Sequence, residues 1–135
     1  MGRPVLILLD THVVLWLAFE ETRISKNAKA AIDEARLGGR GLAISDFTLY
    51  EITMAFRKKR IGVNVSLESF LYEVEQRFVV LPITRPVCVQ TLALPPDYPQ
   101  DPADRIIGAT ALVEGLTLIT ADAKIRKSPA VPTIW

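Results

Sequence analysis

The stretch "YPQDPADRIIGATALVEGLTLITAD", residues 98–122, predicts the unit from which the fold is built, a helix followed closely by a strand. Asp101 and Pro102 are typical of the N-cap and the first position of a helix, so we expect a helix over 102–115. The apolar run "LTLIT", 116–120, is short and continuous, which is typical of a buried strand in a parallel sheet.

The same alternation of strands and helices extends through the rest of the chain. Apolar runs predict strands at 5–9, 42–45, 78–83 and near 132–135. Helical patterns predict helices at 10–19, 24–39, 46–60, 67–77 and 85–94, and a short turn of helix from Asp122. Since strand–helix–strand units have right-handed crossovers, we expect an α/β fold of three layers. Its central, mainly parallel sheet should have about five strands, with helices on both faces.

The size of the chain indicates one domain over residues 1–135. A proline-rich loop precedes the helix at 102, but the chain beyond it is too short for a second domain, so we interpret it as a surface loop. The run "PVLILL", 4–9, is too short for a signal peptide core or a membrane span. The sequence therefore predicts a cytoplasmic protein that does not enter a membrane.

The composition excludes several kinds of site. With 16 basic and 15 acidic residues the net charge is +1, so any binding of nucleic acid needs a local basic patch. A single cysteine, Cys88, excludes an internal disulfide and a cysteine zinc site, and the chain has only one histidine. Carboxylates are therefore the only plentiful metal ligands.

Two acidic residues follow predicted strands. Asp10 ends the first apolar run, and Asp122 stands two residues after the run 116–120. Because the carboxyl ends of parallel strands meet at one edge of a sheet, both side chains are expected there. Each also has a structural explanation, as the N-cap of the helix that follows it. Thr120, beside Asp122, is placed to hydrogen-bond a ligand or a metal-bound water.

Glu51 is unusual because its helix is apolar nearly all round. It shares a helical face with Phe47, Met54 and Ala55. An ionised glutamate on a buried apolar face costs several kcal/mol unless it is paired or bound to a metal. The alternative is that this face is exposed to solvent. We favour a functional role.

Asp101 and Asp104 both lie at the start of one predicted helix. Asp101 suits the N-cap and Asp104 the third position, as in a capping box with aspartate in place of glutamate. The face beyond Asp104 has Ile107, Gly108 and Ala111, so this helix should pack closely against a neighbour. We assign Asp101 to the helix start and Asp104 to the site.

Four carboxylates therefore gather at one edge of the predicted sheet: Asp10, Glu51, Asp104 and Asp122. At separations of about 5 Å they repel by a few kcal/mol per pair at an effective dielectric near 20. They must share protons or bind cations. Oxygen ligands suit Mg²⁺ or Mn²⁺, and a divalent ion in an acidic cluster suits phosphodiester hydrolysis.

The chain contains, in order, the motifs "LLDTHVVLWL", "ISDFTLYEI", "DPADRIIGATAL", "LITAD" and "IW". Together they resemble PIN-domain ribonucleases, and most closely the VapC toxins of toxin–antitoxin pairs. The resemblance implies an Mg²⁺- or Mn²⁺-dependent endoribonuclease that forms a homodimer, is inhibited by a VapB-type antitoxin and cuts structured RNA, often tRNA or rRNA. It also implies that the acids of the site are Asp10, Glu51, Asp104 and Asp122, with the small hydroxyl residues Thr11, Ser45 and Thr120 near the metal.

Three further features have two interpretations each. His12 could contact substrate, but a lone histidine at a helix start more often packs or caps. The basic run "RKKR", 57–60, could meet phosphates, although basic residues also suit a helix C-terminus. Arg105 could orient Asp104 or touch RNA.

The sequence disfavours three other classes of protein. A phosphoacceptor receiver module needs paired acids after the first strand, an aspartate after the third and a lysine after the last, and all three are missing. A haloacid-type phosphatase needs Asp-x-Asp where the chain has "DTH". A PIN-like scaffold without catalysis is disfavoured because all four acids are present.

Overall fold

One all-parallel sheet forms the centre of the molecule, in a computed structural model that describes residues 7–39, 41–58 and 64–135. The strand order is β3-β2-β1-β4-β5, and every neighbouring pair is parallel. The strands are β1 (Ile7–Leu9), β2 (Leu42–Ser45), β3 (Val79–Leu81), β4 (Thr117–Ile119) and β5 (Thr133–Ile134). The predicted sheet is therefore confirmed.

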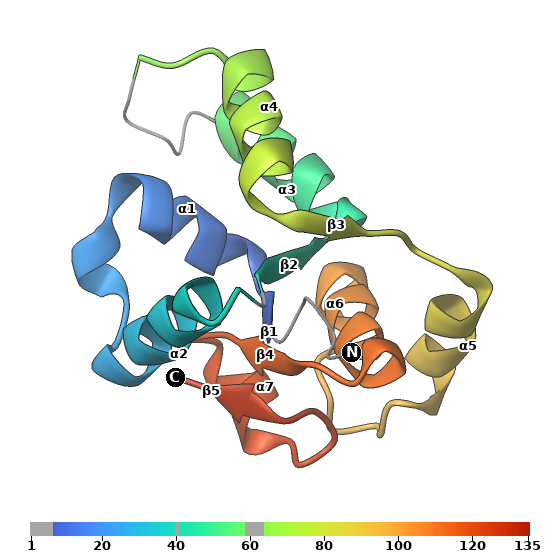
Figure 1. Ribbon diagram of the computed structural model, residues 1–135. Helices are drawn as coiled ribbons and strands as arrows, with labels where there is room; N and C mark the ends of the chain where they lie inside the picture. The colour runs from blue at the N-terminus through green and yellow to red at the C-terminus, as the bar shows by residue number, and fades with distance from the viewer. Residues whose placement is uncertain (1–6, 40, 59–63) are drawn as a thin grey trace.

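Helices cover both faces of this sheet, as Figure 1 shows. One face carries α1 (Thr11–Phe19), α2 (Lys26–Leu37), α3 (Asp46–Arg57) and α4 (Leu67–Arg77), with a 3₁₀ turn at Glu21–Arg23. The other carries α6 (Pro102–Glu114) and α7 (Ala123–Lys127), and α5 (Arg85–Ala93) packs against α6. The three-layer α/β architecture is as expected.

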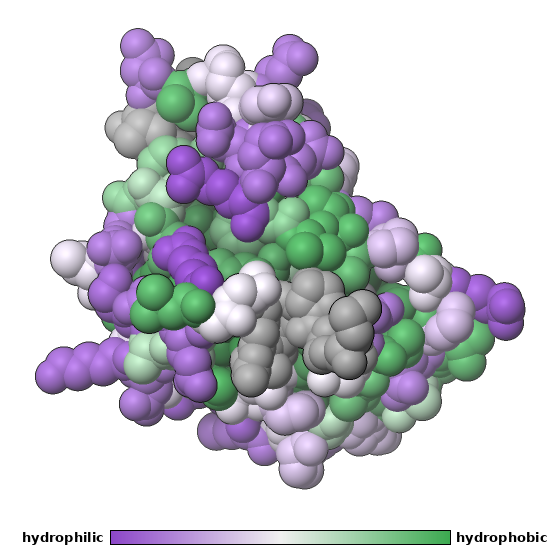
Figure 2. Space-filling model, viewed as in Figure 1, coloured by the Kyte–Doolittle hydropathy of each residue, from purple (hydrophilic) through white to green (hydrophobic). Residues whose placement is uncertain are grey.

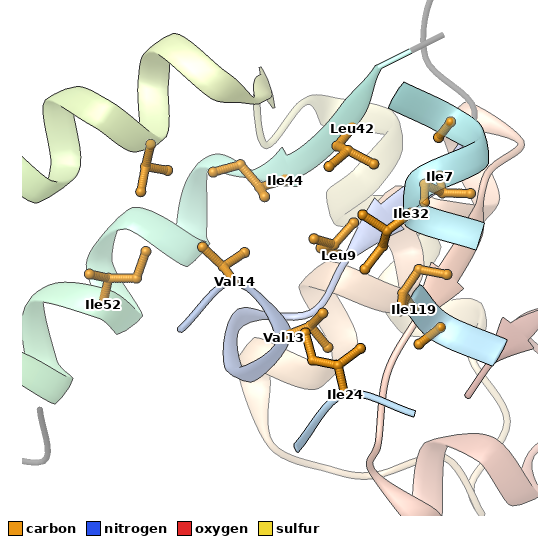
Figure 3. Close-up of a cluster of buried hydrophobic side chains, with 13 residues drawn as sticks. Ile7, Leu9, Val13, Val14, Ile24, Ile32, Leu42, Ile44, Ile52 and Ile119 are labelled. Carbon is orange, nitrogen blue, oxygen red and sulfur yellow. The ribbon is translucent and has the colours of Figure 1, made fainter. Parts of the chain in front are cut away.

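Two buried cores lie on opposite faces of the sheet because neighbouring strand residues point in opposite directions. On β1, Ile7 and Leu9 enter the core shared with α1 to α4, whereas Leu8 enters the core under α6 and α7. Figure 3 shows the first of these cores, in which Leu9, Ile44 and neighbouring aliphatic side chains pack together. Continuous apolar strands therefore supply both cores, as parallel sheets require.

Side-chain caps fix the starts of four helices, of which α4, α5 and α6 begin at the predicted residues and α2 begins at Lys26. The side chains of Ser25, Ser66, Thr84 and Asp101 each accept a hydrogen bond from a backbone N–H of the first helical turn. The third strand is shorter than predicted, since it spans Val79–Leu81 rather than 78–83, and it lies at the edge of the sheet. An edge strand has a partner on one side only, which leaves part of its apolar surface open.

The surface around β3 is correspondingly apolar. Val79 is 43% exposed, and Ile83, just beyond the strand, is 37% exposed. Figure 2 shows hydrophobic surface in this region, below the hydrophilic surface around α4. An unprotected apolar edge strand is a feature that proteins normally cover with another chain or element. No helix among the described residues has the length and apolar character needed to cross a membrane.

The carboxyl ends of β1 and β4 lie side by side at one edge of the sheet. In the β1–β4 pairing Leu9 lies opposite Ile119, so Asp10 and Thr120, the next residues, are neighbours at the carboxyl edge. The backbone N–H of Asp10 donates to the carbonyl of Ile119 at 3.0 Å. This edge is where open α/β sheets bind ligands.

Candidate functional site

Asp10 lies buried at the carboxyl end of β1, with both carboxylate oxygens engaged. Its Oδ1 accepts from the backbone N–H of Thr11 at 2.9 Å, which caps α1, and its Oδ2 accepts from the hydroxyl of Thr120 at 2.8 Å. Only 5% of Asp10 is exposed. The two interpretations of Asp10 are therefore compatible, because it caps a helix and also stands at the edge of the sheet.

Glu51 projects from α3 toward Asp10 and is half-buried rather than enclosed by apolar residues. Its Oε1 accepts a short, 2.5 Å hydrogen bond from the hydroxyl of Thr11, whose oxygen also lies 2.9 Å from that of Thr48. Because an ionised carboxylate can only accept, the chain of donation runs from Thr48 to Thr11 to Glu51.

The pKa of Glu51 is raised by its surroundings. Burial is the largest cause, and the negative charges of Asp10 and Asp101 raise it further. The hydrogen bond from Thr11 opposes this by stabilising the ionised form. Glu51 on α3 is therefore within electrostatic reach of Asp10, before α1, and of Asp101, before α6.

Asp104 lies one turn into α6 and faces the other acids. Burial, followed by the charges of Asp10, Asp101, Asp122 and Glu51, raises the pKa of its carboxyl to about 7. Asp10, Glu51 and Asp122 come from distant parts of the sequence, whereas Asp101 stands three residues before Asp104. The charges of the other predicted acids therefore all act on Asp104.

A buried tyrosine holds the backbone of α6 at Asp104. The hydroxyl of Tyr98, a residue only 1% exposed, donates to the carbonyl of Asp104 at 3.2 Å. Its ring lies so close to Gly108 that a Cβ there would be 2.2 Å from the tyrosine Oη. The close packing predicted around Gly108 is confirmed, and the neighbour is Tyr98. Burial and then the charge of Asp104 hold the Tyr98 pKa well above its usual range.

Asp101 caps the long helix α6 and Asp122 caps the short helix α7, and both acids line one cleft. Asp101 Oδ1 accepts from the backbone N–H of Ala103 at 2.9 Å, which confirms its assignment to the helix start. Asp122 Oδ1 accepts from the backbone N–H groups of Lys124 and Ile125, so its structural explanation also holds. With Asp104 and Lys124, these two acids line an open cleft of about 590 Å³.

His12 joins the start of α1 to the segment after β4. Its Nε2 accepts from the backbone N–H of Ala121 at 3.0 Å, and its Nδ1 lies 3.6 Å from Asp10 Oδ2. Its ring packs on Trp16, with ring centroids 4.9 Å apart. In this position His12 lies behind Asp10 and contributes to the arrangement of the site.

Ser45 and Arg105 make contacts that hold the fold. The hydroxyl of Ser45, fully buried at the end of β2, accepts from the backbone N–H of Phe47 and caps α3. The guanidinium of Arg105 donates to the carbonyls of Thr91 and Tyr98, so it ties α6 to α5 and to the loop between them. These bonds direct Arg105 to backbone oxygens rather than to the carboxylate of Asp104.

The basic run at 57–60 is only partly described. Arg57 ends α3, Lys58 follows it, and both are exposed. Lys59 and Arg60 lie outside the described residues. The interpretation of this run as a phosphate contact therefore stays a prediction.

Two residues of the site were not found from the sequence. Thr48 donates into the network that ends at Glu51, and Tyr98 positions Asp104. Thr48 stands three residues before Glu51, and this helical spacing was an available signal. For Tyr98 the available signal was the small residue Gly108, which indicated a close neighbour but not which one.

The donor set suits a hard divalent cation in kind and in charge. All the acids offer oxygen, and burial together with the negative charges of the other acids raises the pKa of Asp104. As they lie, however, no three Asp, Glu, His or Cys side chains within 7–39, 41–58 and 64–135 are grouped closely enough to hold a metal ion. The acids would have to close around an ion.

Comparisons with known proteins agree with this architecture. The model of the family described as "PIN domain" matches residues 7–130. The chain is 34% identical over 131 residues to "Ribonuclease VapC22" of Mycobacterium tuberculosis, which covers 96% of this chain and 98% of that protein.

Solved structures show the same fold at lower sequence identity. DNA-bound VapBC from Salmonella typhimurium matches with a TM-score of 0.67 at 21% identity, over 96% of both chains. VapBC-1 from nontypeable Haemophilus influenzae matches with a TM-score of 0.66 at 20% identity, again over 96% of both chains. The match over 7–130 and the identity to a full-length relative show that the chain belongs to the PIN-domain family.

Proposed function

We propose that this protein is a divalent-metal-dependent endoribonuclease, the toxin of a VapBC-type toxin–antitoxin pair. The observation that supports it best is the set of acids around Asp104, at the carboxyl edge of the sheet, in a relative of a ribonuclease. The residues proposed to act on RNA through the metal are Asp10, Glu51, Asp104 and Asp122. Structured RNA, such as tRNA or rRNA, is the proposed substrate class.

The proposed metal is Mg²⁺ or Mn²⁺, held by these four carboxylates. When bound, such an ion supplies Lewis-acid activation of the phosphodiester and of the attacking water. This chemistry suits a site in which the sole histidine, His12, is engaged by Ala121 and Asp10. The carboxylates need no role as a general base in this scheme.

Hydroxyl groups of neighbouring residues hold two of the acids in place. Thr120 donates to Asp10, and Thr11 donates to Glu51, where the hydrogen bond lowers the pKa against the effect of burial. Thr120 also accepts from the backbone N–H of Asp122 at 3.1 Å, which links that segment to Asp10. Lys124, exposed on the wall of the acidic cleft, is placed to meet a phosphate of the substrate.

The decisive experiment is RNA cleavage by purified protein free of any partner. Total RNA should be cut in the presence of Mg²⁺ or Mn²⁺, and cutting should stop when EDTA is added. Cleavage that survives thorough chelation would contradict the metal dependence. Binding of Mn²⁺ without any cleavage would favour the alternative, a PIN-like binding module without catalysis.

The proposed protein partner is a VapB-type antitoxin. Structures with the same fold are described as VapBC complexes, two of them bound to DNA. Co-expression with the product of a neighbouring small open reading frame should yield a stable complex in which RNA cleavage is suppressed. Recovery of the two chains separately would count against this partner.

We also propose that the protein forms a homodimer. Large apolar side chains are exposed on several elements, including Val79 on β3 and Leu92 on α5, which is 89% exposed. Burial of such side chains between two copies would stabilise an interface. Sedimentation of the isolated protein should show a dimer at micromolar concentration, and a clean monomer would contradict the proposal.

A further inference from the structure

A second cleft lies beside the acidic one, between α3 and the start of α6. Its volume is about 350 Å³, within the range of roughly 300–1,000 Å³ that is typical of small-ligand pockets. The residues that form its walls include Phe47, Tyr50, Glu51, Met54, Lys58 and Asp101. It is open to solvent along one side of α3.

Two aromatic rings form one wall of this cleft. Phe47 and Tyr50 stand three residues apart on α3, with ring centroids 5.6 Å apart and ring planes inclined by 45°. Tyr50 is 56% exposed, whereas Phe47 is half-buried behind it. Met54, one turn further along α3, extends the apolar surface. A flat, exposed ring that is backed by another ring is a suitable stacking platform for a planar group.

The aromatic cleft and the acidic cleft share one lining residue, Asp101, so they lie next to each other at the start of α6. Glu51, one of the proposed metal-binding acids, stands in the wall of the aromatic cleft. An RNA strand with a phosphodiester at the acids would therefore have a neighbouring nucleotide near this cleft and its exposed ring, Tyr50.

The charges of the cleft select which part of the nucleotide enters it. Glu51 and Asp101, which line the cleft, repel a phosphate group but not a neutral base. Lys58 lies on the cleft wall near the end of α3, where it can meet the backbone phosphate that follows. The arrangement of ring, acids and lysine suits an unpaired base followed by a phosphate.

We propose that this cleft binds an unpaired nucleobase of the RNA substrate, next to the bond that is cut, by stacking on Tyr50. The proposal rests on the proposed function and adds a base-binding subsite to it. Stacking on an aromatic side chain recognises single-stranded RNA with little dependence on sequence. The substrate must then offer a nucleobase that is not held in an RNA duplex, in addition to an accessible phosphodiester bond.

The test is binding of a fluorescein-labelled, unstructured RNA decamer in EDTA, measured by fluorescence anisotropy. Without metal there is no cleavage, so the measurement reports binding alone. Tyr50→Ala should weaken binding roughly tenfold, and Tyr50→Phe should bind as the wild type does because the ring remains. Tyr72→Ala is the matched control: Tyr72 is 60% exposed on α4, outside both clefts, and its loss should leave binding unchanged.

Each outcome decides between the proposals. Unchanged binding by Tyr50→Ala, equal losses in the two alanine variants, or no binding by the wild type would overturn the base subsite. Sedimentation of Tyr50→Ala must give the wild-type mass, since a change from dimer to monomer would show that the cleft is a contact between copies. Tyr50-dependent binding by a protein that cuts no RNA with Mg²⁺ or Mn²⁺ would retain the subsite and reject the proposed nuclease.

Discussion

The backbone N–H of Ala121 donates a 3.0 Å hydrogen bond to Nε2 of His12, across 109 positions of the sequence. Because Nε2 is the acceptor, the ring carries its proton on Nδ1, which faces Asp10 Oδ2 at 3.6 Å. His12 thus connects the acid that follows β1 with the segment that leads to Asp122. We therefore expect His12 to act by holding these two segments in place.

Replacement of His12 by alanine should therefore lower kcat more than it changes KM. A loss of about 10- to 100-fold is expected, as for other groups that orient metal-binding side chains. In the metal-free protein, hydrogen exchange of the Ala121 amide should accelerate. His12→Gln restores a hydrogen-bond acceptor, so it should recover part of the kcat and part of the protection of the Ala121 amide from exchange. An unchanged Ala121 amide in His12→Ala would contradict this role.

Asp101 and Asp104 should respond differently to the same substitution. Asp101→Asn should keep most of the activity and the melting temperature, because asparagine caps a helix about as well as aspartate. Asp104→Asn should lower RNA cleavage by orders of magnitude while the protein still folds. Melting temperature and cleavage of both variants would test the assignment, and an inactive Asp101→Asn beside an active Asp104→Asn would reverse it.

The stability of the metal-free protein should fall as pH rises toward neutrality. The pKa of Asp104 is about 7 in the folded state, above the 3.8 expected when unfolded, so the folded state holds the proton more tightly. This contribution is fully present below about pH 4 and is lost as pH rises through 7. In EDTA, Asp104→Asn should gain melting temperature relative to wild type between pH 4 and 7, and the gain should level off above that range. A gain that does not vary with pH would exclude this origin.

Much of the fold was predictable because its determinants are local. Caps such as Ser25 and Ser66, and short apolar runs such as "LAIS", fix helices and strands from within a few residues. The parallel sheet follows from the order of these elements, and it places Asp10 and Asp122 at one edge. These predictions needed no knowledge of which strands are neighbours.

The remaining features of the site depend on contacts between segments that are distant in the sequence. The hydrophobic periodicity of the sequence gives no information on such contacts. The sequence did not predict that Ala121 would contact His12 or that Tyr98 would fill the space beside Gly108. It also suggested an apolar surrounding for Glu51, whereas a hydrogen bond from Thr11 makes a half-buried position stable. Acids with local capping roles, such as Asp122, can be assigned to the site only as a proposal.

Thr11 should tune the metal affinity through Glu51. Its hydrogen bond lowers the Glu51 pKa against the effect of burial, so Thr11→Val should raise that pKa. Mn²⁺ binding should then weaken more at pH 6 than at pH 8, because protons compete more strongly at the lower pH. Calorimetric titration at both values would measure this. Thr53→Val, which removes a hydroxyl bonded only to the carbonyl of Leu49 in α3, is the control and should bind normally.

Glycine at position 108 should be required because of Tyr98, and a double-mutant cycle can show it. In Gly108→Ala the new Cβ would lie 2.2 Å from Tyr98 Oη and 2.8 Å from its Cζ, so the ring must move. Overpacking of this kind typically costs about 1–3 kcal/mol of stability. The move also breaks the bond to the Asp104 carbonyl, so cleavage should fall together with stability.

Tyr98→Phe removes only the hydroxyl and should cost about 1 kcal/mol through the lost hydrogen bond. In Gly108→Ala/Tyr98→Phe the closest clash is gone, so the double variant should be more stable than the sum of the single effects predicts. Urea denaturation of the four proteins gives the coupling energy directly. If the two effects simply add, Tyr98 does not account for the glycine. If the coupling is present but cleavage is normal in all variants that fold, the tyrosine stabilises α6 without positioning Asp104.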